Sequence, residues 1–247
     1  MVLIHLSLYH GIMARPAAHF SPKNNKKKIM IDISKKISLA KLTAKTHIQV
    51  AGLNLNSAQV VVVLDASKSM HAQYKDGRIQ SLLERLTGLA MALDKDQSFE
   101  LYLFGSEVAK LPALDGESVA GYVDREIIGK YRINQSTNYA PAIARIHSDY
   151  FGSKDPVLVI FITDGDATDK KQTEKVITQV CTQNYYFQFC GVGGERFAFL
   201  EKLDTLKNRP IDNTGFFAAQ ALEGLTDEEF FSSLLEEYSS WFRDYVS

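Results

Sequence analysis

The stretch QVVVVLDASKS, which covers residues 59–69, decides the fold. Its first part, residues 59–64, is almost wholly apolar and rich in β-branched valine, which favours a short strand buried on both faces. The strand is followed by the polar pattern Asp-x-Ser-x-Ser, formed by Asp65, Ser67 and Ser69. Ligands of open α/β sheets bind beyond the carboxyl ends of the strands, so these side chains are candidates for a binding site.

The rest of the chain alternates short apolar runs with amphipathic stretches, which is typical of a parallel sheet covered by helices. We predict further strands over residues 99–104, 108–111, 157–162 and 186–192, with 108–111 as an antiparallel edge. Helices are predicted over residues 78–93, 118–128, 140–150 and 169–181. Thr226 and Glu229 have the spacing of a capping box at the start of a C-terminal helix. These patterns predict an α/β protein whose sheet is doubly wound, mostly parallel and covered by helices on both faces.

The N-terminal part differs from the rest in charge. Residues 21–47 contain eight lysines and one acid, about +7, whereas the whole chain carries −1. We interpret this stretch as a solvated leader, with residues 31–42 pairing onto the sheet or lying on its surface. The alternative is a basic arm that contacts an acidic partner or phosphates. We expect residues 1–28 to be a disordered or poorly ordered leader and residues 29–247 to form one domain.

Composition limits the classes of function. A net charge of −1 gives no reason to expect a nucleic-acid partner. The two cysteines, Cys181 and Cys190, are too few for a disulfide scaffold, which favours a cytoplasmic location. No apolar run approaches the ~18 to 20 residues of a transmembrane helix, so no transmembrane segment is expected.

Two further segments complete a candidate metal site. Asp164 follows the predicted strand 157–162, and if that strand is a neighbour of 59–64, Asp65 and Asp164 face one crevice. Two carboxylates repel each other there unless a cation lies between them. The loop QSTNYAP, residues 135–141, supplies a third hydroxyl, for which we choose Thr137, with Ser136 as the alternative.

The donor atoms favour a hard ion. Serine and threonine hydroxyls with few carboxylates suit Mg²⁺, with Mn²⁺ or Ca²⁺ as alternatives. These loops contain no cysteine, and the six histidines of the chain show no ligand spacing, which argues against zinc. A plain strand-end turn is the alternative interpretation of Asp-x-Ser-x-Ser taken alone.

The three segments together resemble the metal-ion-dependent adhesion site (MIDAS) of von Willebrand factor A (vWA) domains. The resemblance implies a six-stranded, Rossmann-like sheet. It also implies that Ser67, Ser69 and Thr137 bind the metal directly, while Asp65 and Asp164 act mainly through water. One coordination position would then be left for an acidic side chain of a partner protein. Lys68 stands where the superfamily often has glycine, and we expect its side chain to point to solvent.

Within that superfamily, four short sequence segments resemble the bacterial TerF-like branch, which is linked to tellurite resistance and stress-response operons. They are YKDG at residues 74–77, LFG at 103–105, GVGG at 191–194 and LDTL at 203–206. The resemblance implies a divalent-cation-dependent protein-binding module and not an enzyme. The alternatives are a metal-dependent phosphoester hydrolase and a purely structural metal site.

Three side chains near the predicted site have two interpretations each. Tyr74 and Tyr139 either line a partner-binding rim or pack over the loops, and packing is favoured. Asp166 is expected to cap a helix or stabilise a turn instead of binding the metal.

Overall fold

The computed structural model describes residues 22–194 and 196–246. The strands are β1 (Gln59–Asp65), β2 (Phe99–Phe104), β3 (Val108–Leu114), β4 (Val157–Thr163), β5 (Tyr185–Val192) and β6 (Thr214–Ala219). The helices are α1 (Pro22–Val50), α2 (His71–Lys75), α3 (Arg78–Leu93), α4 (Tyr139–Tyr150), α5 (Lys170–Val180), α6 (Ala198–Asp204) and α7 (Asp227–Tyr245). A π-helical turn, Val123–Ile127, and a 3-10 turn, Leu222–Gly224, lie between them.

All six strands belong to one sheet in the order β3-β2-β1-β4-β5-β6. The neighbouring strands are parallel, except that β2 and β3 are antiparallel. The order runs outward from β1 in one direction and from β4 in the other. This is the predicted doubly wound, mostly parallel sheet with an antiparallel edge strand.

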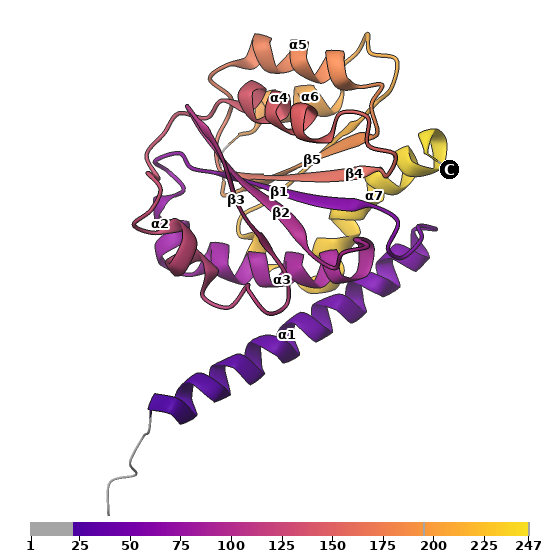
Figure 1. The fold of residues 1–247 in the computed structure, drawn as a ribbon. Helices are drawn as coiled ribbons and strands as arrows, with labels where there is room; N and C mark the ends of the chain where they lie inside the picture. The colour runs from indigo at the N-terminus through magenta and orange to yellow at the C-terminus, as the bar shows by residue number, and fades with distance from the viewer. Residues whose placement is uncertain (1–21, 195, 247) are drawn as a thin grey trace, which may run out of the picture.

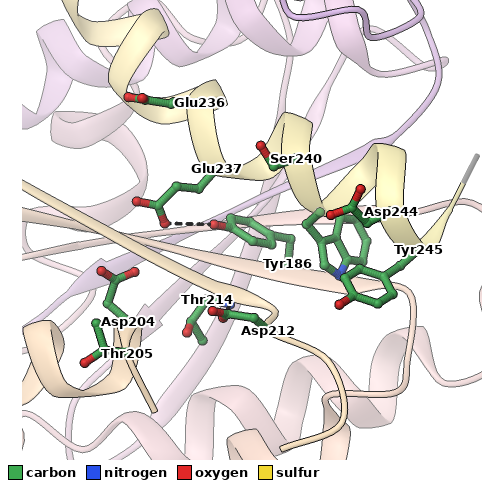
Figure 2. Close-up of a pocket in the computed structure, with 11 residues that line it drawn as sticks. Tyr186, Asp204, Thr205, Asp212, Thr214, Glu236, Glu237, Ser240, Asp244 and Tyr245 are labelled. Carbon is green, nitrogen blue, oxygen red and sulfur yellow. Dashed lines mark hydrogen bonds between the residues drawn. The ribbon is translucent and has the colours of Figure 1, made fainter. Parts of the chain in front are cut away.

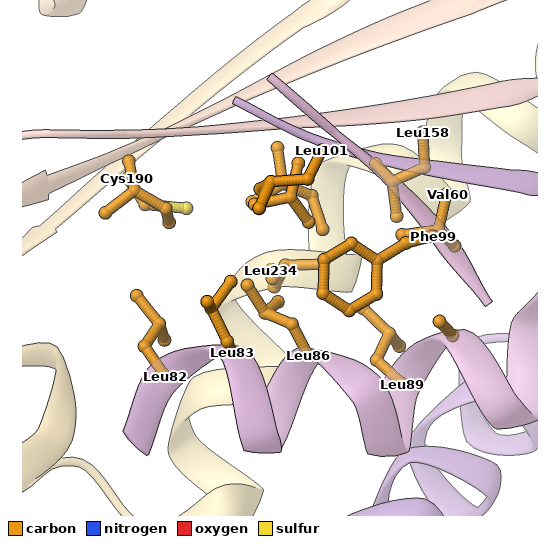
Figure 3. Packing of buried hydrophobic residues seen from close by; sticks show 14 of the residues in the cluster. Val60, Leu82, Leu83, Leu86, Leu89, Phe99, Leu101, Leu158, Cys190 and Leu234 are labelled. Carbon is orange, nitrogen blue, oxygen red and sulfur yellow. The ribbon is translucent and has the colours of Figure 1, made fainter. Parts of the chain in front are cut away.

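Helices cover both faces of the sheet (Figure 1). Val60, Val62 and Leu64 of β1 pack into the core layer formed with α3 and α7, while Val61 and Val63 face the layer of α4, α5 and α6. All five side chains are buried. β1 is therefore buried on both faces, as its valine-rich sequence predicts. Figure 3 shows the leucines of α3 pointing toward the sheet.

The segment that precedes β1 forms a long helix, α1, so the prediction that residues 31–42 pair onto the sheet or lie on it was wrong. Four small or aliphatic residues at helical spacing are buried: Ile37, Ala40, Ala44 and Ile48. This face packs on α3, which itself covers the sheet (Figure 1). The predicted domain boundary at residue 29 lies inside α1, and residues 1–21 of the predicted leader lie outside the described part of the chain.

The prediction of a helix over residues 118–128 was also wrong, because only the π-helical turn forms there. Asp115 accepts hydrogen bonds from the backbone N–H groups of Glu117 and Ser118, which holds a turn before the segment. Gly121 then has φ +64, outside the helical region. The chain therefore enters a helical conformation only at its last turn.

Besides α1, three elements were not predicted from the sequence: α2, α6 and β6. α2 has five residues and α6 has seven, too few for an amphipathic period to stand out. β6 is an edge strand whose apolar run, residues 216–219, is only four residues long, and these side chains are partly or fully exposed. Within the described residues, none of the helices is both long enough and apolar enough to cross a membrane.

Candidate metal centre

The carboxyl ends of β1 and β4 meet at one edge of the sheet, because the two strands are parallel neighbours. The chain leaves β1 toward α3 on one face and leaves β4 toward α5 on the other (Figure 1). A crevice forms where neighbouring connections diverge in this way. Asp65, the last residue of β1, and Asp164, the residue after β4, both lie at this point.

Asp65 is fully buried, and both of its carboxylate oxygens accept hydrogen bonds. One accepts from the backbone N–H of Ser67 at 2.7 Å, and the other from the Thr163 hydroxyl at 2.6 Å. Burial, with a smaller contribution from the charge of Asp164, raises the pKa of Asp65 to about 6, although these hydrogen bonds lower it. Asp65 is thus a desolvated carboxylate that fixes the start of the loop that carries Ser67 and Ser69, here called the serine loop.

The two serine hydroxyls and Asp164 form a compact oxygen cluster. The hydroxyls of Ser67 and Ser69 are 3.1 Å apart. Ser69 donates a hydrogen bond of 2.7 Å to Asp164 Oδ1, and the Ser67 hydroxyl lies 3.5 Å from the same oxygen. Segments that are 95 residues apart in the chain therefore place three oxygens at one point.

The loop that carries Thr137 is joined to both strand ends. The backbone N–H of Gln135 donates to the carbonyl of Ala66 at 3.0 Å, and that of Thr168 donates to the carbonyl of Thr137 at 2.9 Å. The buried hydroxyl of Thr137 faces Gly165, where a Cβ would lie 3.7 Å from it. The loop thus lies between the serine loop and the Asp164 loop.

Ser136, the alternative ligand, lies elsewhere. Its exposed side chain has its hydroxyl 3.4 Å from that of Ser106. The structure therefore places Thr137, and not Ser136, beside the Asp164 loop.

Both tyrosines near the site are packed into the protein. Tyr74 is 2% exposed and donates to the carbonyl of Asp65, while Tyr139 is fully buried and donates to Gly165 O at 2.9 Å. They support the loops and do not form a rim. Lys68 is exposed, as expected. Asp166 accepts from the backbone N–H of Phe199 in the first turn of α6, which is a capping contact.

Comparison with known proteins identifies the family. Residues 57–247 match the vWA-TerF-like family, described as the vWA found in the TerF C terminus. The chain belongs to this family. The uncharacterized protein YcbR of Bacillus subtilis (strain 168) is 30% identical over 213 residues, which cover 84% of this chain and 87% of YcbR.

Solved structures show the same vWA fold. The manganese-loaded TRAP protein of Plasmodium vivax is 18% identical with a TM-score of 0.52, over 78% of this chain and 75% of that one. Proximal thread matrix protein 1 of the mussel byssus, with a zinc-occupied MIDAS motif, is 15% identical with a TM-score of 0.52. That match covers 75% of this chain and 46% of the mussel chain, so this vWA domain spans less than half of the mussel protein's length.

The donor set of this vWA domain suits a hard divalent cation. The clustered atoms are hydroxyl and carboxylate oxygens, which Mg²⁺ and Mn²⁺ accept. Within the described residues no three His, Cys, Asp or Glu side chains gather as metal ligands, so a bound ion would depend on hydroxyl oxygens and water. A cation at this point would also offset the repulsion between Asp65 and Asp164.

Sequence patterns missed two supporting residues. Thr163 is the last residue of β4, and its hydroxyl holds Asp65. Asp169 accepts from the backbone N–H groups of Tyr139 and Ala140 at 3.1 and 2.9 Å, so it caps α4 from a different loop. The Thr-Asp-Gly motif could have indicated Thr163. The contact between Asp169 and Ala140 joins residues 29 apart, so no local sequence pattern indicates it.

Proposed function

We propose that this vWA domain is a protein-binding module that holds one divalent cation, Mg²⁺, at a MIDAS-type site. Ser67, Ser69 and Thr137 would hold the ion directly, and Asp65 and Asp164 would act mainly through water. A glutamate or aspartate of a partner protein would take the remaining coordination position. The observation that carries the proposal is the meeting of Ser67, Ser69 and Asp164 Oδ1 within 3.5 Å.

The residues of the site divide into positioning and contact groups. Asp65 is buried, so it orients the serine loop through the Ser67 N–H and does not reach the surface. Ser69 is exposed and Asp164 is partly exposed, so they form the open side of the site. The bound ion would supply positive charge at this opening, which a partner carboxylate would neutralise.

The same burial supports binding over hydrolysis. Asp65 is fully buried and each of its oxygens already accepts a hydrogen bond from the protein, so this carboxylate is poorly placed to contact a substrate. Ser67 also stands where an aspartyl phosphatase has its second aspartate. We therefore propose that the domain is not an enzyme.

The family suggests the setting. We propose a role in a bacterial tellurite-resistance or stress-response system, since TerF names the family. A cytoplasmic location is supported by Cys181 and Cys190, which are both free and buried.

Calorimetry and pull-down test this function together. Wild-type protein is expected to bind one Mg²⁺ and to capture a protein from the native cell in Mg²⁺ but not in EDTA. Asp65→Ala should lose both properties, while Asp76→Ala, which changes an exposed carboxylate paired with Arg78, should keep both. Absence of Mg²⁺ uptake by the folded wild type would refute the site, and metal-independent capture would refute its role in binding.

A further inference from the structure

A second pocket of about 480 Å³ lies between α6, β6 and α7. Tyr186, the second residue of β5, and Thr214, the first residue of β6, line it at the amino ends of these strands. The metal centre lies at the carboxyl ends of β1 and β4, at the opposite edge of the parallel sheet. The pocket is therefore separate from that site, and its volume suits a small ligand.

The pocket is strongly acidic. No lysine or arginine is among the described residues that line it. Five carboxylates line it: Asp204, Asp212, Glu236, Glu237 and Asp244. Asp212 forms an ion pair with Arg209, which lies outside the lining. Glu237 of α7 and Asp204 of α6 point toward each other across the pocket (Figure 2). Burial raises the pKa of both carboxyls. The charge of Asp204 also raises the pKa of Glu237, and the charge of Asp212 raises that of Asp204 against the lowering effect of Arg209.

Aromatic side chains form part of the wall. Tyr186, Trp241 and Tyr245 line the pocket, and the rings of Tyr186 and Trp241 are 5.6 Å apart. Tyr186 donates a hydrogen bond of 3.2 Å to Glu237 (Figure 2). Carboxylates beside aromatic faces are the surroundings that organic cations prefer, because both the charge and the ring quadrupole attract them.

Two buried polar groups beside the pocket have no hydrogen-bond partner among the described residues. Trp241, which lines the pocket, is 4% exposed, and its indole nitrogen is unpartnered. Gln188 is 1% exposed, and its side-chain oxygen is also unpartnered. A Cβ on Gly215 would lie 2.9 Å from this oxygen and 2.4 Å from both Glu237 Oε2 and the Tyr186 hydroxyl, so the Gln188 oxygen lies close to two groups that line the pocket. An unsatisfied acceptor beside a carboxylate favours a ligand that donates hydrogen bonds.

We propose that this acidic pocket binds an organic cation, an alkylammonium or guanidinium group, between Asp204 and Glu237 and against the aromatic wall. The group belongs either to a free polyamine or to a lysine or arginine side chain of a protein. A metal ion fits less well, because within the described residues no three acidic side chains gather closely enough to coordinate one. The proposal does not depend on the metal centre.

Trp241 is the only tryptophan of the chain, so its fluorescence reports directly on this pocket. The full-length protein is titrated with spermidine, with N-acetyl-lysine methylamide and with the neutral N-acetyl-norleucine methylamide. Both cationic probes are expected to change the fluorescence in a saturable way, and the neutral probe should not. Tighter binding of the lysine derivative would assign the cation to a protein side chain, and tighter binding of spermidine would assign it to a free polyamine.

Variants locate the binding. Asp204→Asn combined with Glu237→Gln should weaken the binding of the cation about tenfold or more, as expected for loss of a charge-assisted contact. Glu228→Gln changes an exposed carboxylate on the same helix outside the pocket and should leave affinity unchanged, as should Asp65→Ala. Should the double variant lose its circular dichroism spectrum, Asp244→Asn provides the same test with a weaker expected effect.

Three outcomes would overturn the proposal. The first is no saturable change with either cation, and the second is equal affinity in the wild type and the folded pocket variants. The third is a fluorescence change caused by Ca²⁺ alone that the same variants abolish, because the pocket would then be a metal site.

Discussion

The hydroxyl of Thr163 donates a hydrogen bond of 2.6 Å to the carboxylate of Asp65 and so joins the ends of two neighbouring strands. The Tyr139 hydroxyl lies 3.0 Å from the Thr163 hydroxyl, which extends the link to α4. Asp65 reaches the serine loop with its other oxygen. The position of the serines therefore depends on a buried chain of hydrogen bonds behind them.

Thr163→Val tests this support. The variant keeps the shape of the side chain but removes the donor to Asp65, so Mg²⁺ affinity is expected to fall about tenfold. Thr163→Ser keeps the hydroxyl and should bind nearly as well as the wild type. Isothermal titration calorimetry measures both. An unchanged affinity in the folded valine variant would mean that Asp65 is positioned without Thr163.

Binding of the cation should stabilise the fold. A ligand at about a hundred times its dissociation constant adds about 2.7 kcal/mol to the free energy of unfolding. Urea unfolding in Mg²⁺ and in EDTA measures this difference for the wild type. Asp164→Ala should abolish it and Asp76→Ala should retain it. A Mg²⁺ effect that persists in Asp164→Ala would place the ion elsewhere.

Arg85 is expected to be the most sensitive charged residue for stability. It is 4% exposed and pairs with Asp227 at 2.7 Å, and its guanidinium lies 4.4 Å from the centre of the Phe230 ring. Its other nitrogens donate to two backbone carbonyls near the start of α7. Arg85→Met leaves these acceptors without a donor and should cost about 3 kcal/mol in urea unfolding. Arg78→Met, at a more exposed ion pair, should cost less than about 1 kcal/mol.

The contact between α1 and α3 requires glycine at position 88. A Cβ on Gly88 would lie 2.6 Å from the Cβ of Ala40 and 2.7 Å from the backbone nitrogen of Lys41. Gly88→Ala should therefore destabilise the protein by about 2 kcal/mol in thermal or urea unfolding. Gly116→Ala is the control, because its Cβ would meet only the flexible side chain of Met91 at 3.3 Å. Equal stability of the two variants would show that the helices separate at little cost.

The acidic pocket should make stability depend on pH. Burial and Asp204 raise the pKa of Glu237 from 4.5 to about 7. The folded state then holds this proton more tightly than the unfolded state, so the contribution of Glu237 to stability is present below about pH 4.5 and is lost as the pH rises through about 7. Urea unfolding at about pH 5 and about pH 8 should show a smaller loss of stability in Glu237→Gln than in the wild type. Glu228→Gln should behave as the wild type, and an identical loss in all three proteins would contradict the raised pKa.

The central part of the fold could be predicted because its signals are local. The valine run of β1 and the capping box of Thr226 and Glu229 each lie within a few residues, and the structure shows both. The edge strand β6 could not be predicted, since its six residues, TGFFAA, show no alternation of apolar and polar side chains. Helix α1 was missed because its buried face is made partly of alanines, such as Ala40 and Ala44. The close packing of Ala40 depends on Gly88 of α3, which lies far from it in the sequence.

The candidate metal centre could also be predicted from the sequence, because most of its residues lie next to recognisable strands. Asp65, Ser67 and Asp164 stand directly at strand ends, and a parallel sheet brings such ends together. The contacts of Asp169 and Thr163 join separate loops, so only the three-dimensional structure could reveal them. The acidic pocket likewise draws on residues from 186 to 245, and no local motif marks it.

The match to the family model begins at residue 57, after the end of α1 at Val50, so a fragment cut at this boundary would lack the helix. Phe231 and Leu235 of α7 are buried and lie beside His47 of α1. A recombinant fragment trimmed to residues 57–247 would expose these side chains to water and would be prone to aggregate. Expression and crystallisation of relatives should therefore retain the segment that corresponds to α1.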